Sequence, residues 1–424
     1  MLCEMKSSEK PKIILLICLQ FYIFVCTITK TKFINMKKLM PFMVLFALCS
    51  FYMQAQDVIV GAARTDVYVP ELKGKRVALL SNHTGMVGKK HTLDIMLENG
   101  LNVVTIFSPE HGFRGNADAG EKVASGVDKQ TGVPIASLYD GKTPMPSKET
   151  MDKIDIIVVD IQDVGLRFYT YYVTMIHLMD AAAQYGKQFM VLDRPNPNGM
   201  YVQGPILDMK FRSGVGWLPI PIVYGMTMGE LALMANGEYW LEKGYRVNGL
   251  TVVKCLNYTH STRYRLPIAP SPNLPNMKSV YLYPSTCFFE GTSLSLGRGT
   301  KLPFQVYGHP DMKGYKYTFT PRSVPGAKNP PLLNKLCYGV NLSKLADEEI
   351  IAGGINLEYV IDAVKNMGAE KVFERARFFD LLAGGDSIRK MIIAGKSAQE
   401  IKASWKADEE AFKAKRKKYL IYDE

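Results

Sequence analysis

In the stretch IDIIVVDIQDVG, residues 154–165, an apolar run is followed by polar residues. A buried strand by itself does not require those polar residues. The first part of the stretch, Ile154 to Asp160, is predicted to form a strand. Apolar residues then recur at helical spacing until Gly186, and Gln188 to Leu192 predicts another buried strand. Apolar strands separated by an amphipathic helix indicate a parallel sheet that helices cover on both faces.

The same alternation is present before this stretch. The sequence predicts strands at 76–80 and 101–107, with a short helix at 91–98 between them. After the stretch, Thr227 and Glu230 have the spacing of a capping box, which opens a helix expected to reach about Trp240. We therefore expect an α/β domain with an open parallel sheet over residues 56–264.

The remainder, residues 265–424, is more irregular. It begins with a Pro-rich stretch at 267–284 and contains a further loop at 321–331. Asn356 is expected to cap a helix, and the capping box Ser397–Glu400 is expected to open one long, charged final helix. These signals predict a smaller α+β domain that follows the first.

The composition is that of a globular protein. The chain has 424 residues, of which 47% are hydrophobic and 22% are charged, so a sizeable core is available and wholesale disorder is not expected. The basic run at 413–418 is most simply a solvated helix face, and no nucleic-acid partner is expected. No internal repeat of solenoid length is visible.

The first 55 residues differ from the rest. Two apolar runs lie there, and the second follows Met36-Lys37-Lys38, which is typical of a secretory signal peptide. We expect Met36 to be the true start and the mature protein to be exported, either periplasmic or extracellular. A membrane anchor made of either run is the alternative. Cys49 invites lipidation, but Leu48 before it is too large for a good lipidation site.

Removal of this segment changes the charge and the cysteine count. It carries seven Lys/Arg and two Asp/Glu, so the net charge falls from +12 to +7. Three of the seven cysteines remain, Cys255, Cys287 and Cys337, and we expect no disulfide among them.

Polar motifs follow four of the predicted strands. Because the carboxyl ends of parallel strands form the ligand crevice of an open α/β sheet, motifs gathered at this edge favour a site over simple turn chemistry. The motifs are SNHTG (81–85), SPEHG (108–112), DIQDVG (160–165) and DRPNP (193–197).

Several kinds of site are not supported. The chain lacks a G-x-G-x-x-G after the first strand, a phosphate-binding G-x-x-x-x-G-K-[ST] and a G-x-S-x-G nucleophile elbow. His83, His91 and His111 have no metal-ligand spacing, and hydrogen-bonding roles are the stronger interpretation. We therefore expect neither a cofactor nor a metal.

Carboxylate side chains are better candidates for catalytic groups than the histidines or serines. Glycosidic cleavage needs one carboxyl group to protonate the leaving oxygen, together with a base, a nucleophile or help from the substrate. Glu110 follows a buried strand and Pro109, where partial burial would favour its protonated form. For Asp118, Glu121 and the other loop acids, a helix cap or a surface ion pair is at least as plausible.

Arginines and tyrosines near these motifs could bind an anionic sugar. Arg114, Arg167, Arg194 and Arg298 could clamp an anion bidentately. The tyrosines of RFYTYY (167–172) could stack on a sugar ring, but they could equally be core residues at the start of a helix.

Taken together, the motifs resemble the exo-β-N-acetylmuramidase family of bacterial cell-wall glycosidases. The matching stretches run in order across most of the chain: SNHTG (81–85), FSPEHGFRG (107–115), DAGE (118–121), DIQDVGLRFYTY (160–171), VLDRPNP (191–197), GMTMGELA (225–232), PSPNLP (270–275) and FEGTSLSLGRGT (289–300). The last hundred residues match more loosely.

The resemblance implies a Rossmann-like catalytic domain that binds no dinucleotide, a smaller C-terminal domain and a cleft between them. It implies release of terminal β-1,4-linked N-acetylmuramic acid from peptidoglycan fragments, with no stable protein partner. The family's catalytic glutamate maps to Glu110. The candidate substrate-binding residues in or near the motifs are Asn82, His83, His111, Arg114, Glu121, Asp160, Gln162, Asp163, Arg167, Tyr169, Asp193, Arg194, Asn273, Glu290 and Arg298.

Two other functions stay open on the sequence. The same cleft could bind muropeptides without cleaving them. An esterase or amidase acting on wall substituents ranks last, because no nucleophile elbow is present.

Overall fold

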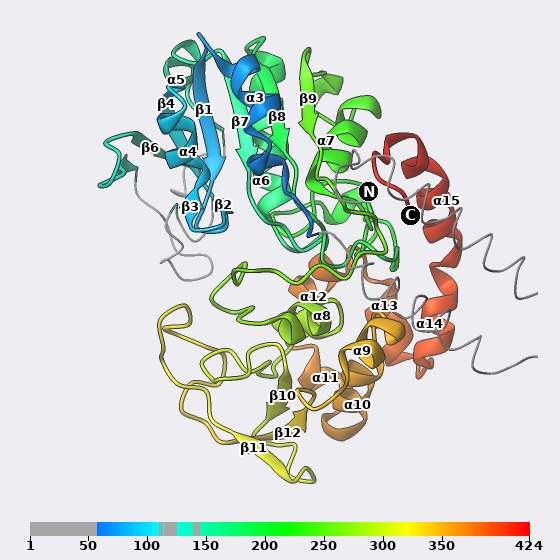
Figure 1. Ribbon diagram of the computed structural model, residues 1–424. Coiled ribbons are helices and arrows are strands. Elements are labelled where there is room, and N and C mark those ends of the chain that lie inside the picture. The colour runs from blue at the N-terminus through cyan, green and yellow to red at the C-terminus, as the bar shows by residue number, and fades with distance from the viewer. Residues whose placement is uncertain (1–56, 110–112, 114–124, 139–144) are drawn as a thin grey trace, which may run out of the picture. The chain divides into compact units, whose positions relative to one another are not determined.

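The central element is a seven-stranded sheet, which lies within the described residues 57–109, 113, 125–138 and 145–424 of a computed structural model (Figure 1). Along the chain its strands are β1 (Arg76–Ser81), β4 (Asn102–Ser108), β5 (Gly126–Val127), β6 (Pro134–Ser137), β7 (Ile156–Asp160), β8 (Gln188–Leu192) and β9 (Leu250–Val253). Their order in space is β5-β6-β4-β1-β7-β8-β9.

Most neighbouring strands run parallel, and β5 pairs antiparallel with β6 at one edge. The chain starts at β1, moves outwards through β4 and β6, and then returns to β7 on the other side of β1. This reversal creates a switch point between the carboxyl ends of β1 and β7, where Ser81 is paired with Asp160. The predicted Rossmann-like α/β class is confirmed.

Both faces of the sheet are buried, as the strand sequences require. In β7, Ile156 and Val158 join one hydrophobic core while Ile157 and Val159 join the other. Side chains of α3 (Thr65–Leu72) and α4 (Thr92–Glu98) complete the first core. Those of α5 (Lys148–Asp152), α6 (Tyr171–Gln184) and α7 (Met228–Gly237) belong to the second.

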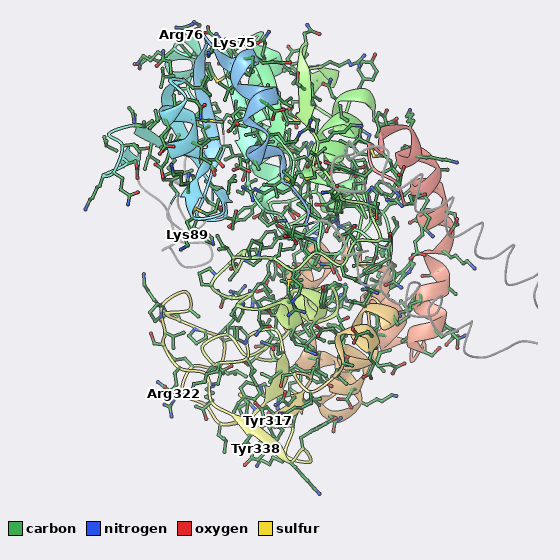
Figure 2. All side chains as sticks on the ribbon, viewed as in Figure 1. Lys75, Arg76, Lys89, Tyr317, Arg322 and Tyr338 are labelled. Carbon is green, nitrogen blue, oxygen red and sulfur yellow. The ribbon has the colours of Figure 1, made fainter. Side chains whose placement is uncertain are left out.

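The two ends of β1 show which side of the sheet carries the carboxyl ends of the parallel strands. Lys75 and Arg76 lie where β1 begins, whereas Lys89 lies near its opposite end, in the hairpin of β2 (Met86–Val87) and β3 (Lys90–His91) (Figure 2). The motif residues that follow β1 are therefore on the Lys89 side.

The C-terminal part contains a small antiparallel sheet and a set of helices. The sheet has the order β10-β12-β11, with β10 (Val306–His309), β11 (Tyr317–Phe319) and β12 (Cys337–Asn341). The helices are α8 (Met277–Thr286), α9 (Asp347–Gly353), α10 (Glu358–Met367), α11 (Ala369–Val372), α12 (Ala376–Ala383), α13 (Ser387–Ile393), α14 (Ala398–Ser404) and α15 (Lys406–Arg416).

Three helix expectations need correction. The helix opened by Thr227 ends at Gly237, before Trp240, because Tyr239 takes a left-handed conformation with φ of 58°. The Pro-rich stretch is not all loop, since an Asn276 capping box opens α8. The final helix is broken at Trp405, whose side chain is buried in the core.

The core on the α6 side of the sheet continues into the C-terminal helices. Arg167, which is fully buried, makes part of this connection. One guanidinium nitrogen donates to the carbonyl oxygens of Pro205 and Ile220, both at 2.8 Å. The other donates to those of Leu382 and Ala383, at 3.3 and 2.7 Å, at the end of α12. Contacts across the expected boundary near residue 265 are therefore extensive, and residues 58–424 group as one compact unit.

The C-terminal segment packs beside β9 through Tyr422. The hydroxyl group donates to Asp193 Oδ2 at 2.7 Å and accepts from the Cys255 N–H at 2.8 Å. Replacing Tyr422 by phenylalanine is expected to lower the free energy of unfolding by about 1–3 kcal/mol, because it leaves a buried N–H unpaired. Urea unfolding measures this loss. Tyr239→Phe, on the exposed surface, is the control and should change stability by less than about 0.5 kcal/mol.

Cys255, Cys287 and Cys337 are buried as free thiols. Among the described ranges, no helix is both long enough and apolar enough to cross a membrane. The signal peptide expected at residues 36–55 lies outside those ranges.

Candidate active site

A buried ion pair holds the switch point of the sheet together. Asp160 ends β7, and its two carboxylate oxygens accept from Arg194 Nε at 2.6 Å and Arg194 Nη2 at 2.9 Å. Thr92 donates a further bond of 2.5 Å to Asp160 Oδ2. Asp160 is fully buried and Arg194 is 4% exposed. Because Arg194 is committed to this pair, we expect it to hold the strand ends rather than clamp a substrate anion.

Asn82 and Gln162 tie the loops after β1 and β7 to their neighbours. Asn82 Oδ1 accepts from the amide and hydroxyl groups of Thr84, at 2.9 and 2.6 Å. The Thr84 hydroxyl in turn accepts from the Gln162 N–H at 3.0 Å. Gln162 Nε2 donates to the carbonyl oxygens of Asp163 and Pro195, at 2.8 and 2.7 Å. These contacts position the loop backbones.

Asp163 and Asp193 are buried carboxyl groups at the same edge. Burial raises the pKa of Asp163 to about 7, although hydrogen bonds from Gly165 and Tyr224 oppose the shift. Burial also raises the pKa of Asp193 to about 6. Asp193 Oδ1 accepts from the Gly229 N–H at 2.9 Å, at the start of α7.

The raised pKa of Asp163 predicts a pH-dependent stability. In the folded protein the group binds its proton more tightly than when unfolded, so this contribution to stability is lost as the pH rises from about 4 to about 7. Asp163→Asn keeps an oxygen acceptor and has no charge to bury. Relative to wild type, it should therefore gain up to about 4 kcal/mol between pH 4 and pH 8.

Urea unfolding of both proteins at the two pH values measures this gain. Asp66→Asn, on the exposed face of α3, is the matched control. The prediction would be contradicted if Asp163→Asn changed the free energy of unfolding by the same amount at both pH values.

A cavity of about 1020 Å³ lies between the start of α6 and the C-terminal part. The lining residues from the earlier part of the chain are Leu138, residues 168–177 and residues 214–217, and those described include no Lys, Arg, Asp or Glu. We call this set the neutral wall. The lining residues from position 271 onwards, which we call the cationic wall, include Arg298, Lys328 and Arg375 together with one acid, Glu290.

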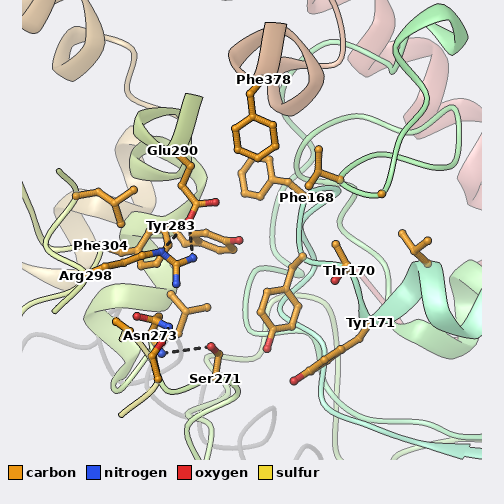
Figure 3. Close-up of a pocket in the computed structure, with 18 of the residues that line it drawn as sticks. Phe168, Thr170, Tyr171, Ser271, Asn273, Tyr283, Glu290, Arg298, Phe304 and Phe378 are labelled. Carbon is orange, nitrogen blue, oxygen red and sulfur yellow. Dashed lines mark hydrogen bonds and ion pairs between the residues drawn. The ribbon is translucent and has the colours of Figure 1, made fainter. Parts of the chain in front are cut away.

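Glu290 and Arg298 form an ion pair on the cationic wall (Figure 3). Arg298 Nε and Nη2 both donate to Glu290 Oε1, the first at 2.9 Å. The guanidinium carbon lies 5.0 Å from the ring centroid of Phe304. Asn273 lies close by and donates to the Gly326 carbonyl oxygen at 2.8 Å. This wall offers fixed polar groups and a positive charge to a ligand.

Aromatic side chains form much of the neutral wall. Figure 3 shows Phe168 and Tyr171 across the cavity from Glu290. The hydroxyl groups of Tyr169 and Tyr171 donate to the Pro270 carbonyl oxygen at 2.8 and 3.3 Å, and their rings meet edge to face. His83 Nε2 lies 2.9 Å from the oxygen of the preceding Ala269. The segment at 269–274 is thus held against both β1's loop and α6.

The carboxyl end of β4 is bonded to a residue that lines the same cavity. Ser108, the last residue of β4, accepts a hydrogen bond of 3.1 Å from the N–H of Leu138, which lines the cavity. Glu110 follows Ser108 by two positions in the chain. Glu110, His111, Arg114 and Glu121 lie outside the described residues.

The predicted site residues thus separate into distinct places. Tyr169, Asn273, Glu290 and Arg298 come together around the cavity, and His83 contacts the segment beside it. Arg167 lies in the core with its charge on four carbonyl groups. Burial lowers the pKa of its guanidinium to about 10. The switch-point residues are Asn82, Asp160, Gln162, Asp163, Asp193 and Arg194, and none of them lines the cavity.

Sequence reasoning missed several lining residues. His177 lies on α6 away from the apolar stripe that identified the helix, so periodicity gave no reason to select it. Trp217 sits in an irregular segment and Tyr283 inside the Pro-rich stretch. Lys328 and Arg375 are ordinary cations in sequence, and only the fold brings them to the cavity. Among the described residues, no group of three or more His, Cys, Asp or Glu could hold a metal ion.

Comparison with known families identifies the arrangement. Residues 77–278 match the N-terminal model of exo-β-N-acetylmuramidase NamZ, and residues 281–422 match its C-terminal model. The chain belongs to the exo-β-N-acetylmuramidase NamZ family. The two matches extend from the second residue of β1 to the C-terminal segment that contains Tyr422, so the NamZ family covers both walls of the cavity.

A characterised relative and two solved structures support the NamZ assignment. Peptidoglycan β-N-acetylmuramidase NamZ of Bacillus subtilis (strain 168) is 41% identical over 374 residues, which cover 84% of this chain and 89% of the relative. Two DUF1343 family proteins from Bacteroides fragilis NCTC 9343 have similar crystal structures. One has 64% identity and a TM-score of 0.81 over 87% of this chain and 100% of its own. The other has 30% identity and a TM-score of 0.72, covering 86% and 99%.

Proposed function

We propose that this protein is an exo-acting glycoside hydrolase that releases terminal β-1,4-linked N-acetylmuramic acid from peptidoglycan fragments. The observation that carries the proposal is the match to a peptidoglycan β-N-acetylmuramidase over most of both chains. The two family models add that both parts of the fold belong to this kind of enzyme.

The chemistry of the cavity suits such a substrate. N-acetylmuramic acid carries a lactyl carboxylate, and the cationic wall keeps a net positive charge from Lys328 and Arg375 after Arg298 pairs with Glu290. An arginine guanidinium such as that of Arg375 can bind a carboxylate. Sugar rings also have apolar faces, which aromatic side chains such as those of Phe168 and Tyr171 can cover.

Cleavage requires protonation of the glycosidic oxygen as the bond to the anomeric carbon breaks, and water supplies the new hydroxyl group. We assign the proton donor to Glu110, which the family resemblance selects. Its support from the described residues is indirect: Ser108, two positions earlier, is bonded to the cavity-lining Leu138. Glu290 is a further carboxylate at the cavity, but its pairing with Arg298 favours a substrate-positioning role.

The test is product analysis. The purified protein is incubated with a β-1,4-linked N-acetylmuramyl-N-acetylglucosamine disaccharide, and the products are identified by mass spectrometry. Free N-acetylmuramic acid is expected. Binding by calorimetry without sugar release would favour a non-catalytic module. A product changed only in its acetyl or peptide groups would favour an esterase or amidase.

We also propose that the protein is exported, because Met36-Lys37-Lys38 precedes an apolar run and a polar start near residue 56. Expression of the full gene in its natural host, followed by fractionation and N-terminal sequencing, tests this. The mature chain is expected outside the cytoplasm, beginning near residue 56. An intact N-terminus on cytoplasmic protein would reject the proposal.

A further inference from the structure

One corner of the cavity contains a buried imidazole that lacks a hydrogen-bond partner within the described chain. His177 of α6 lines the cavity and is 9% exposed. Asp180 Oδ2 lies 4.0 Å from its Nδ1, beyond hydrogen-bond range. Because the imidazole lines the cavity, its ring nitrogens are placed to bond a ligand that enters the cavity.

The surroundings of His177 are pre-formed. The ring of Trp217 lies 4.5 Å from it, edge to face. The guanidinium of Arg212 stacks 3.7 Å from the centre of that indole, and it is itself paired with Glu242 at 2.6 Å. The backbone N–H of Trp217 donates to the Tyr172 hydroxyl at 2.9 Å. We call His177, Trp217 and the adjacent lining residue Thr174 the His177 corner.

The His177 corner belongs to the neutral wall. Burial, with a smaller effect from Arg212, lowers the pKa of His177 to about 4. The imidazole is therefore uncharged near pH 7 and can both donate and accept a hydrogen bond. The cationic wall has three basic side chains and one acid, Glu290, so it keeps a net positive charge. The two walls thus differ in charge.

The two sugars joined by the cleaved bond differ in the same way. N-acetylmuramic acid is anionic, whereas N-acetylglucosamine is neutral and presents hydroxyl and acetamide groups. We propose that the His177 corner binds the N-acetylglucosamine ring of the leaving group, with His177 bonding a polar substituent and Trp217 contacting the ring. This assignment rests on the proposed function, and it makes the corner a determinant of specificity for the leaving group.

Two substrates with the same N-acetylmuramyl group test it. One is a chromogenic aryl β-N-acetylmuramide, whose leaving group lacks hydroxyl and acetamide groups. The other is the disaccharide with N-acetylglucosamine. In His177→Leu, the ratio of kcat/KM for the disaccharide to kcat/KM for the aryl substrate is expected to fall about tenfold, the effect of losing one hydrogen bond.

Two further variants control for shape and for histidine loss elsewhere. His177→Gln keeps a polar nitrogen near the position of Nε2 and should keep the ratio within about threefold of wild type. His309→Leu, on β10 and outside the cavity lining, should leave the ratio unchanged. An unaltered ratio in His177→Leu, whether or not both activities fall, would overturn the assignment.

Direct binding separates this proposal from the proposed function. Trp217 is one of three tryptophans in the chain and the one that lines the described cavity. N-acetylglucosamine is expected to change tryptophan fluorescence in wild type, and Trp217→Phe or His177→Leu should remove that change. A wild-type protein that cleaves neither substrate but shows this response would reject only the hydrolase. If wild type showed no fluorescence change, or if both variants kept the change, the assignment of the His177 corner to N-acetylglucosamine would be rejected.

Discussion

Replacing Glu110 by glutamine is expected to lower kcat/KM for a chromogenic β-N-acetylmuramide by about 100- to 10,000-fold. Glutamine has nearly the same shape as glutamate but cannot give up a proton to the glycosidic oxygen. The loss should appear chiefly in kcat, because substrate contacts made by the cationic wall remain. Initial rates measured over a range of substrate concentrations separate kcat from KM.

The control is Glu149→Gln. Glu149 lies on α5, where its side chain is 81% exposed and paired with Lys153. This variant has the same chemical change and should keep wild-type rates. Equal activity in Glu110→Gln and wild type would remove Glu110 from the mechanism. A change confined to KM would assign it to substrate binding instead.

Replacing Asp160 by alanine is expected to lower the free energy of unfolding by about 3–5 kcal/mol. The substitution leaves Arg194 buried without a counter-charge and also removes the acceptor of the Thr92 hydroxyl. The buried guanidinium of Arg194 would have neither water nor a carboxylate to offset its loss of hydration, and this destabilises the folded state. Urea unfolding followed by circular dichroism measures the change.

A surface pair of the same chemistry provides the comparison. Arg76 and Asp155 are joined by two side-chain hydrogen bonds, yet their side chains are 45% and 39% exposed. Asp155→Ala should therefore cost about 1 kcal/mol or less. The double variant Asp160→Leu/Arg194→Met should recover much of the loss of Asp160→Ala, because no unpaired charge remains. Equal costs for Asp160→Ala and Asp155→Ala would contradict this account.

The parallel sheet was predictable because its signal is local. In β7 and β8 nearly every side chain is buried, which produces the uninterrupted apolar runs seen in the sequence. The small sheet gave no such signal. Its strands are only three to five residues long, mix buried and partly or fully exposed side chains, and are joined by irregular loops.

The site was predictable only in part, for a related reason. Polar residues after buried strands pointed to the carboxyl edge of the sheet, but the pattern could not separate residues that hold that edge from residues that line the cavity. Asp160 and Arg194 neutralise each other, whereas Glu290 and Arg298 form a similar pair at the cavity. His177 and Trp217 meet through folding alone. Glu110, the residue with the most weight in the mechanism, stays a prediction from sequence.

The contacts of Arg167 restrict how the two parts of the chain can be recombined between relatives. Its guanidinium is bonded to the carbonyl groups of Leu382 and Ala383, more than 200 positions along the chain. Gly384 packs against it so closely that a β-carbon there would lie 2.2 Å from one of its nitrogens. If two relatives exchanged their C-terminal halves, the new half would have to keep these contacts with Arg167. Otherwise the guanidinium would be buried without hydrogen-bond acceptors. The two halves are therefore expected to be inherited as a unit, and a chimera joined near residue 280 should unfold more readily than either parent.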